Sequence, residues 1–178
     1  PLDDLIDENY LKIFESKGYK ITKFITYITD LTNPIEDIWS RVQKYTKINV
    51  KRAVKRGITI KELETIEEME QVVNLHQKWA KTKGLQIINP KEKIKELWDK
   101  HINLIEKNFL AFNKNELIAA ISLSFFNNIV IPTQVLNSYS KVTSLGGPAL
   151  TWRAITWGKE SNMKIYDITG GPLILENE

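Results

Sequence analysis

The sequence contains no cysteine, which excludes disulfide bridges and metal sites built on thiolates. It holds two histidines and no cluster of carboxylates, so it offers no residue set suited to a transition-metal site. No apolar run approaches the length of a membrane-spanning helix, and the first residues lack the pattern of a secretory signal. We therefore expect no metal and no membrane span, and we assign the protein to a reducing compartment, the cytoplasm.

The composition bounds the size of the fold and the kind of partner. With 178 residues and 42% hydrophobic content, the chain is long enough for one domain with a core. Its net charge of +3 is mild, so any argument for binding a polyanion depends on where the cations lie.

The order of periodic segments predicts an α/β (α+β) domain with a mixed, mostly antiparallel sheet and helices on both faces. Residues 1–23 are predicted to be an N-terminal helical extension or the remnant of a preceding domain, and residues 24–178 the main domain. Helices are expected over residues 33–56, 65–83, 89–107 and 148–160, and strands over 19–31, 58–63 and 164–169, with a three-strand meander over 109–138. Pro132, which has no N–H to donate, marks an edge or a bulge in the third strand of the meander.

The first long helix carries a run of cations. Lysines 44, 47, 51 and 55 recur at helical spacing beside Arg41, Arg52 and Arg56, and no acid occurs between Asp37 and Glu62. Like charges at this spacing repel, so stability does not require them. Two interpretations remain open: a solvated helix face, or a surface for a phosphate-bearing partner. The binding residues of the second are Lys47, Lys51, Arg52, Lys55 and Arg56.

A second candidate site lies in residues 139–171. A loop with the hydroxyls of Tyr139, Ser140, Thr143 and Ser144 and the pair Gly146–Gly147 precedes a helix that Pro148 helps to start. Free N–H groups at such a helix start favour an anion. The next strand delivers Asp167 to its C-terminal end, before Gly170 and Gly171. An ordinary turn is the alternative for the loop.

These segments resemble a known family. The helix has the form P-x-L-x-W-x-x-I-x-W-x-K and is followed by I-Y-D-x-x-G-G, while residues 47–57 carry a basic N-x-x-R-A-x-K-R-G segment. Together, over residues 24–172, they resemble the FemABX family, the aminoacyltransferases that build peptidoglycan interpeptide bridges from domains of the GNAT acyltransferase type.

The resemblance implies a GNAT-like domain, truncated at its C-terminus in a fragment of a longer protein. It also implies transfer of an acyl or aminoacyl group to an amine, which a nucleotide-linked or peptide precursor could carry. The donor would be aminoacyl-tRNA or acyl-CoA, bound as a co-substrate with no permanent cofactor. The run from Thr143 to Pro148 lacks the leading Arg or Gln of the GNAT phosphate loop, which argues against CoA.

Roles for individual residues follow from this chemistry. Asp167 could accept a proton from the attacking ammonium or orient it, and Tyr139 could donate to a carbonyl or hold the acceptor. Ser140, Thr143, Ser144, Gly146, Gly147, Gly170 and Gly171 would contact donor or substrate. The alternatives are a loop-capping aspartate and hydroxyls at the rim of the site. Two other functions stay open: a non-catalytic nucleic-acid-binding module that uses helix 41–56, and a catalytically silent GNAT-like half of a larger enzyme.

Overall fold

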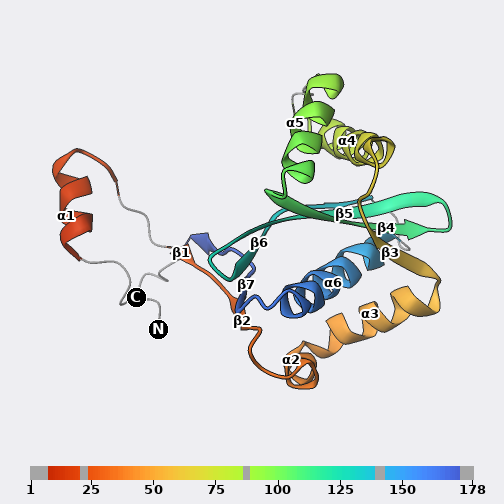
Figure 1. Cartoon of the computed structure of the whole chain (residues 1–178), viewed down its shortest axis with the longest axis horizontal. Coiled ribbons are helices and arrows are strands. Elements are labelled where there is room, and N and C mark those ends of the chain that lie inside the picture. Colours follow the sequence, from red (N-terminus) through yellow and green to blue (C-terminus); the bar gives the residue numbers. More distant parts are fainter. Residues whose placement is uncertain (1–7, 21–23, 86–88, 139–142, 173–178) are drawn as a thin grey trace. The chain divides into compact units, whose positions relative to one another are not determined.

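The computed structural model describes residues 8–20, 24–85, 89–138 and 143–172 (Figure 1). The chain divides into two compact units, one formed by Pro1–Tyr27 with Thr169–Glu178 and the other by Ile28–Ile168. Both ends of the chain thus belong to the smaller unit, and the larger unit is one continuous segment between them.

The smaller unit contains helix α1 (Glu8–Ser16) and a two-stranded sheet of β1 (Phe24–Ile25) and β8 (Gly171–Pro172). The two strands are antiparallel, with Ile25 opposite Gly171. A Cβ atom on Gly170 would stand 1.1 Å from the Ile25 carbonyl oxygen, so only glycine fits there. Glycine at position 170 therefore allows its backbone to pack directly against the backbone of Ile25.

The larger unit is built on a six-stranded sheet in the order β2-β7-β6-β5-β4-β3. Its strands are β2 (Ile28–Asp30), β3 (Ile58–Glu62), β4 (Glu106–Asn113), β5 (Glu116–Phe126), β6 (Ile129–Asn137) and β7 (Ile165–Asp167). All neighbours are antiparallel except β6 and β7, which are parallel. The predicted mixed, mostly antiparallel sheet and its meander are confirmed.

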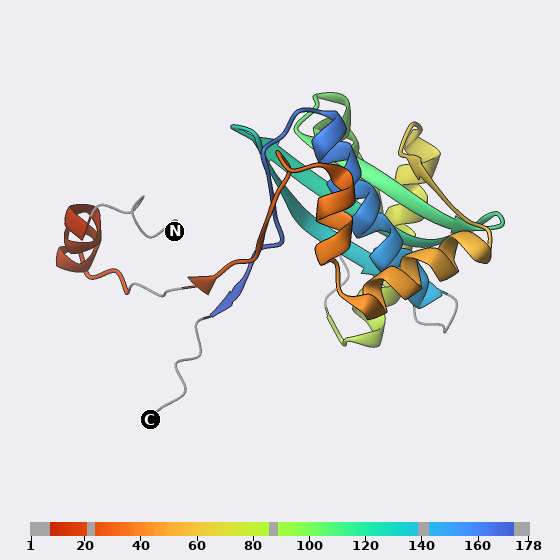
Figure 2. The same ribbon diagram turned by 90° about the horizontal axis from the view of Figure 1, so that it is seen from below.

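Helices cover both faces of this sheet, as predicted (Figures 1 and 2). On one face lie α2 (Ile35–Arg41), α3 (Lys44–Lys55) and α6 (Gly146–Glu160), and on the other lie α4 (Ile66–Thr82) and α5 (Pro90–Ile102). Leu150 and Ala154 of α6 pack with Phe109 of β4 in one core cluster. Met69 of α4 packs with Leu110, the next residue of β4, in the other cluster. The alternation of side chains along β4 thus supplies both cores.

The prediction of one continuous helix over residues 33–56 is wrong, because the helix is interrupted after Arg41. Val42 and Gln43 adopt extended conformations, with ψ of 136° and 141°, and separate α2 from α3. The bend lets Trp39 pack on Trp152 of α6, with 4.5 Å between ring centroids. It also lets Lys47 Nζ donate to the Ser40 carbonyl oxygen at 2.6 Å. Tertiary contacts therefore override helix propensity at this point.

Other helix starts follow the sequence signals closely. The helix predicted from residue 65 begins with a capping box of Thr65 and Glu68. The Asn89 side chain accepts from Lys91 N at the start of α5, where Pro90 is the first residue. α2 differs, because its N-cap is Pro34 and Asn33 instead donates to the Asp30 carbonyl oxygen at 3.2 Å. The capping residues thus mark a helix start reliably where their side chains accept from the first N–H groups of that helix.

Candidate functional site

The parallel strands β6 and β7 separate after a short contact. They pair only at Ile129 with Ile165 and at Val130 with Tyr166. β6 then continues to Asn137, whereas β7 ends at Asp167. Beyond Val130, no described strand pairs with the edge of β6 that faced β7. Backbone polar groups on this edge therefore have no partner in a described strand.

A bulge interrupts β6 just beyond the point of separation. Ser122 of β5 lies opposite Gln134, and Leu123 lies opposite Pro132, so Thr133 is an extra residue in β6. The Thr133 hydroxyl donates to the Ser122 carbonyl oxygen at 3.2 Å. Pro132 thus occupies a bulge, one of the two positions predicted for it. Bulges turn the backbone out of the ladder and commonly lie beside active sites.

Helix α6 begins near the far end of β6. A short 3₁₀ turn, η2 (Thr143–Leu145), leads into Gly146. Leu145 at the N-cap supplies no side-chain hydrogen bond, and the first turn of α6 contains no acid. The first N–H groups of the helix therefore have no cap from Leu145, and the positive end of the helix dipole is not neutralised by an acid of the first turn.

The two glycines of this turn have packing partners. A Cβ atom on Gly146 would lie 2.7 Å from Ala119 Cβ, and one on Gly147 would lie 2.9 Å from Asn137 Oδ1. Both glycines are buried. Because neither glycine has a side chain, the first turn of α6 packs directly against Ala119 of β5 and Asn137 of β6.

Asn137 is a site residue that the sequence did not single out. It is the last residue of β6, and its Oδ1 atom is buried without a hydrogen-bond partner among the described residues. A buried polar atom without a partner is costly, and such atoms are few in folded proteins. No local signal in the sequence marks this asparagine, because its burial depends on the packing of α6 against the sheet.

Asp167 lies where the two strands separate. It is the residue after the last β6–β7 pair, opposite Ile28 of β2. Tyr166 is buried in the core on the α6 side, where burial raises the pKa of its phenol to about 12. Since successive residues of a strand alternate, Asp167 is directed to the other face of the sheet, and it is partly exposed.

The remaining predicted residues fall in three groups. Tyr139 and Ser140 lie outside the described residues. Thr143 and Ser144 form η2 at the start of α6, where Ser144 is exposed. Gly170 and Gly171 belong to the smaller unit, with Gly171 in β8.

Four of the basic residues lie on α3, which packs against α6 and contacts η2, and Arg56 is the C-cap residue of this helix. Lys51, Arg52, Lys55 and Arg56 are exposed. Lys47 is only partly exposed, and its ammonium is engaged by the Ser40 carbonyl oxygen. The structure therefore places four of the five predicted basic residues on an open surface, on the same face of the sheet as α6.

A series of hydrogen-bonded polar side chains on the face covered by α4 and α5 was also not predicted from the sequence. Ser122 Oγ donates to Asn108 Oδ1 at 2.6 Å, and Asn108 Nδ2 lies 3.4 Å from His101 Nδ1. Burial lowers the pKa of His101, which favours the neutral ring. Through the Ser122 carbonyl oxygen the chain reaches Thr133, so it connects the end of α5 to the bulge.

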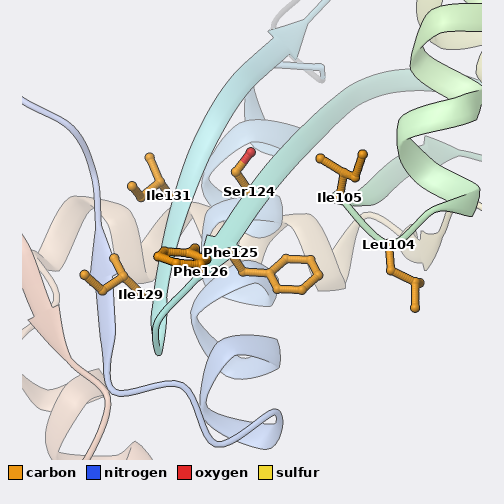
Figure 3. Close-up of a pocket in the computed structure, with 7 residues that line it drawn as sticks. All are labelled: Leu104, Ile105, Ser124, Phe125, Phe126, Ile129 and Ile131. Carbon is orange, nitrogen blue, oxygen red and sulfur yellow. The ribbon is translucent and has the colours of Figure 1, made fainter.

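An apolar pocket of about 410 Å³ opens at the other end of the β5–β6 hairpin (Figure 3). Its lining consists of Leu104, Ile105, Ser124, Phe125, Phe126, Ile129 and Ile131. Ser124 supplies the single side-chain polar group among these seven residues. Apart from the Ser124 hydroxyl, the lining therefore offers no side-chain group that could take part in catalysis.

Within the described part of the chain, no group of three or more acidic or histidine side chains is arranged to hold a metal ion. None of the helices there combines the length and the apolar character needed to cross a membrane.

Comparison with solved structures identifies the fold. FemX superposes with a TM-score of 0.73 over 96% of this chain and 61% of its own, at 12% identity. L-PGS from Bacillus licheniformis gives a TM-score of 0.66 over 96% of this chain and 52% of its own, at 14% identity. A possible acetyltransferase from Clostridium difficile 630 gives 0.50 over 60% of this chain and 74% of its own, at 11% identity.

No protein-family model and no curated protein matches the sequence. The chain spans 61% and 52% of the length of the first two structures. The fold is therefore that of FemX and of GNAT-type acetyltransferases, as the sequence resemblance predicted. The free edge of β6, its bulge and the start of α6 form the candidate site on this fold.

Proposed function

We propose that the protein transfers an acyl or aminoacyl group from an activated donor to an amine. The observation that carries the proposal is the separation of β6 from β7 beside a bulge, with the start of α6 near the far end of the freed edge. The likeness of the fold to FemX and to a possible acetyltransferase supports it.

The free edge of β6 suits the reacting carbonyl. Amide formation needs donors for the oxyanion that develops when the amine nitrogen attacks the carbonyl carbon. Backbone N–H groups at the bulge around Thr133 can supply them without reorganisation. The start of α6 can hold a phosphate of the donor, because its first N–H groups have no cap from Leu145 and its dipole favours an anion.

Asp167 is the residue to which we assign the proton of the acceptor. The acceptor ammonium must lose two protons as the new C–N bond forms and the C–O or C–S bond to the donor breaks. The leaving oxygen or sulfur takes up one proton, and a carboxylate within reach of the ammonium can accept the other. Asp167 lies at the end of β7, where β6 and β7 separate, directly after the last residue that pairs with β6.

The donor is aminoacyl-tRNA or acyl-CoA. The loop before α6 lacks the leading Arg or Gln of the GNAT phosphate loop, which favours aminoacyl-tRNA. A nucleotide-linked or peptide precursor would carry the acceptor amine, and transfer would take place in the cytoplasm. A non-catalytic nucleic-acid-binding module is the second candidate, favoured by the exposed cations of α3.

The test measures transfer of a radiolabelled group to a peptide amine, from bulk aminoacyl-tRNA and separately from acetyl-CoA. We expect transfer from one donor, and Asp167→Asn should lower the rate about 10²-fold to 10⁴-fold. Asp99→Asn, the same change at an exposed position of α5, is the matched control. Absence of transfer from both donors, or equal rates for the two variants, would contradict the proposal.

A further inference from the structure

An exposed apolar surface surrounds the pocket at the turn end of the β5–β6 hairpin (Figure 3). Phe126 is 85% exposed, Leu104 is 73% exposed and Ile105 is 57% exposed, and all three line the pocket. Side chains of this kind stabilise a fold when they are buried, and in water they contribute little to it. Large apolar side chains that gather in water around a hollow are typical of a binding surface.

The backbone of Leu104 points to the same conclusion. Its φ is 55°, in the left-handed region that asparagine and glycine adopt more readily than leucine. The turn of the neighbouring β5–β6 hairpin meets the same requirement with Asn127 and Asn128, at φ of 48° and 65°. Stability alone would therefore favour asparagine at position 104 as well, and the leucine supplies apolar surface to the pocket instead.

The pocket lies on the face of the sheet to which Asp167 is directed. Val130 and Tyr166, which pair with each other, both belong to the core on the α6 side. Side chains alternate along a strand, so the two neighbours of Val130, Ile129 and Ile131, are directed to the opposite face. Asp167, the neighbour of Tyr166, is directed to that face as well.

Asp167 stands beside one wall of the pocket. The two strands pair last at Val130 and Tyr166, so the next residues, Ile131 of β6 and Asp167 of β7, are level with each other along the sheet. Ile131 lines the pocket. On the other side, Ile28 of β2 pairs with Asp167 and is 48% exposed. This carboxylate thus has an apolar side chain on each neighbouring strand.

We propose that the pocket holds the apolar group of the acceptor and that Asp167 binds the ammonium group of the same molecule. The acceptor is then a primary amine that carries an aromatic ring or a branched aliphatic chain a few bonds from its nitrogen. The pocket volume of about 410 Å³ falls within the range of ligand pockets, roughly 300–1,000 Å³. The role of this amine as acceptor rests on the proposed function, whereas its binding does not.

The charges around the pocket select for such a molecule. Among the described residues, none with a positive charge lines the pocket, so the lining offers no partner for a phosphate or a carboxylate. Asp167 repels these groups. The Ser124 hydroxyl, on the residue opposite Ile131, is the single polar side-chain group of the lining. An apolar cation is therefore complementary to both the lining and Asp167, and a donor phosphate is complementary to neither.

A bilayer or a second copy of the chain could cover the same exposed side chains. Neither accounts for the carboxylate beside the wall of the pocket, because covering Asp167 with an apolar surface would remove it from water without a cation. The ammonium of an apolar amine supplies that cation. The amine is therefore the occupant to which we commit.

The experiment measures binding of 2-phenylethylamine to the full chain without any donor, by ligand-observed NMR titration. Ethylamine has the same ammonium without the ring, and 2-phenylethanol has the ring without the ammonium. We expect 2-phenylethylamine to bind about tenfold more tightly than ethylamine or better, because its ring leaves water. It should bind about threefold more tightly than 2-phenylethanol or better, because it pairs with a carboxylate.

Two variants test the two halves of the site. Asp167→Asn should abolish the preference for 2-phenylethylamine over 2-phenylethanol and leave the affinity for the alcohol within about twofold. Leu104→Asn should weaken binding of both aromatic compounds about threefold or more, and asparagine suits the backbone there. Leu85→Asn, the same change at a leucine that is 51% exposed outside the pocket, is the matched control and should bind within about twofold of the wild type.

Equal affinities for 2-phenylethylamine and ethylamine would overturn the proposal, as would equal effects of the two leucine variants. Sedimentation of the chain with phosphatidylcholine vesicles without binding of the amine would overturn it and assign the surface to lipid. A dimer in analytical ultracentrifugation without binding of the amine would overturn it and assign the surface to a second copy. Circular dichroism of the variants shows that each is folded.

Transfer to the same amines separates this proposal from the proposed function. With a labelled donor, kcat/KM for 2-phenylethylamine should exceed that for ethylamine about tenfold. If the amine binds as expected and no donor supports transfer, the proposed function fails and the pocket stands as a site for apolar amines. If transfer proceeds without preference between the two amines, the pocket proposal fails and the proposed function stands.

Discussion

The side chain of Asn137 lies against the Cα atom of Gly147. A Cβ atom at Gly147 would stand 2.9 Å from Asn137 Oδ1 and 3.0 Å from Nδ2, closer than non-bonded atoms pack. The contact joins the last residue of β6 to the second residue of α6. It fixes the start of the helix against the strand that has separated from β7.

Gly147→Ala should destabilise the larger unit. The added methyl group must displace the Asn137 amide, and overpacking of this kind costs about 1–3 kcal/mol. The better helix propensity of alanine offsets up to about 1 kcal/mol of this. We expect a net loss of about 1 kcal/mol or more in the free energy of unfolding, measured by urea denaturation.

The double variant Gly147→Ala, Asn137→Ala is the control for this contact. Removing the amide makes room for the methyl group, so the double variant should recover most of the loss, and the double-mutant cycle should give a coupling energy above about 0.5 kcal/mol. Additive effects would show that the two side chains do not compete for one space.

Two phenylalanines on neighbouring strands should respond differently to the same truncation. Phe109 is 1% exposed and contacts Trp157 edge to face, whereas Phe126 is 85% exposed. Phe109→Ala should cost about 3–5 kcal/mol of unfolding free energy. Phe126→Ala should change it by no more than about 0.5 kcal/mol. Chemical denaturation of both variants checks this, and comparable losses would mean that Phe126 is covered in solution.

The ion pair of Glu68 predicts a dependence of stability on pH. Burial acts to raise the pKa of Glu68, but hydrogen bonds from Lys61 and from the N–H groups of Glu64 and Thr65 outweigh it and lower the pKa below 4.5. The folded state therefore holds this carboxylate ionised. The stability that it contributes is present above pH 4.5 and is lost as the pH falls through the lowered pKa.

Glu68→Gln should consequently cost about 1 kcal/mol at neutral pH and progressively less below pH 4.5. Urea denaturation at a series of pH values measures the difference from the wild type. The control is Glu67→Gln, at the exposed neighbouring position, for which we expect little difference at any pH. A constant cost of Glu68→Gln across the series would contradict the assignment.

Local signals predicted most elements of the fold, because their causes lie within a few residues. The capping box of Thr65 with Glu68 is an example. The break after Arg41 has no signal in the local sequence, whereas in the structure Val42 and Gln43 are extended there and Trp39 packs on Trp152 of α6. Chain order alone cannot place such a contact.

Around the candidate site, the sequence predicted the secondary-structure elements but not their pairing. A strand that ends at Asp167 and a helix that starts near Gly146 follow from the sequence pattern. The bulge at Thr133 and the separation after Val130 depend on strand register, which only the assembled sheet defines. The glycines before Pro148 were interpreted as room for a ligand, and their contact with the sheet became visible only in three dimensions.

The larger unit begins and ends on neighbouring strands, because Ile28 of β2 pairs with Asp167 of β7. Paired residues of antiparallel strands lie about 5 Å apart, so the entry and exit of this unit almost meet. A module with this property can be spliced into a surface loop of another protein by a single insertion that leaves the host backbone almost unstretched. It can also be rejoined through a short linker and opened elsewhere, which would give a circular permutant with the same sheet.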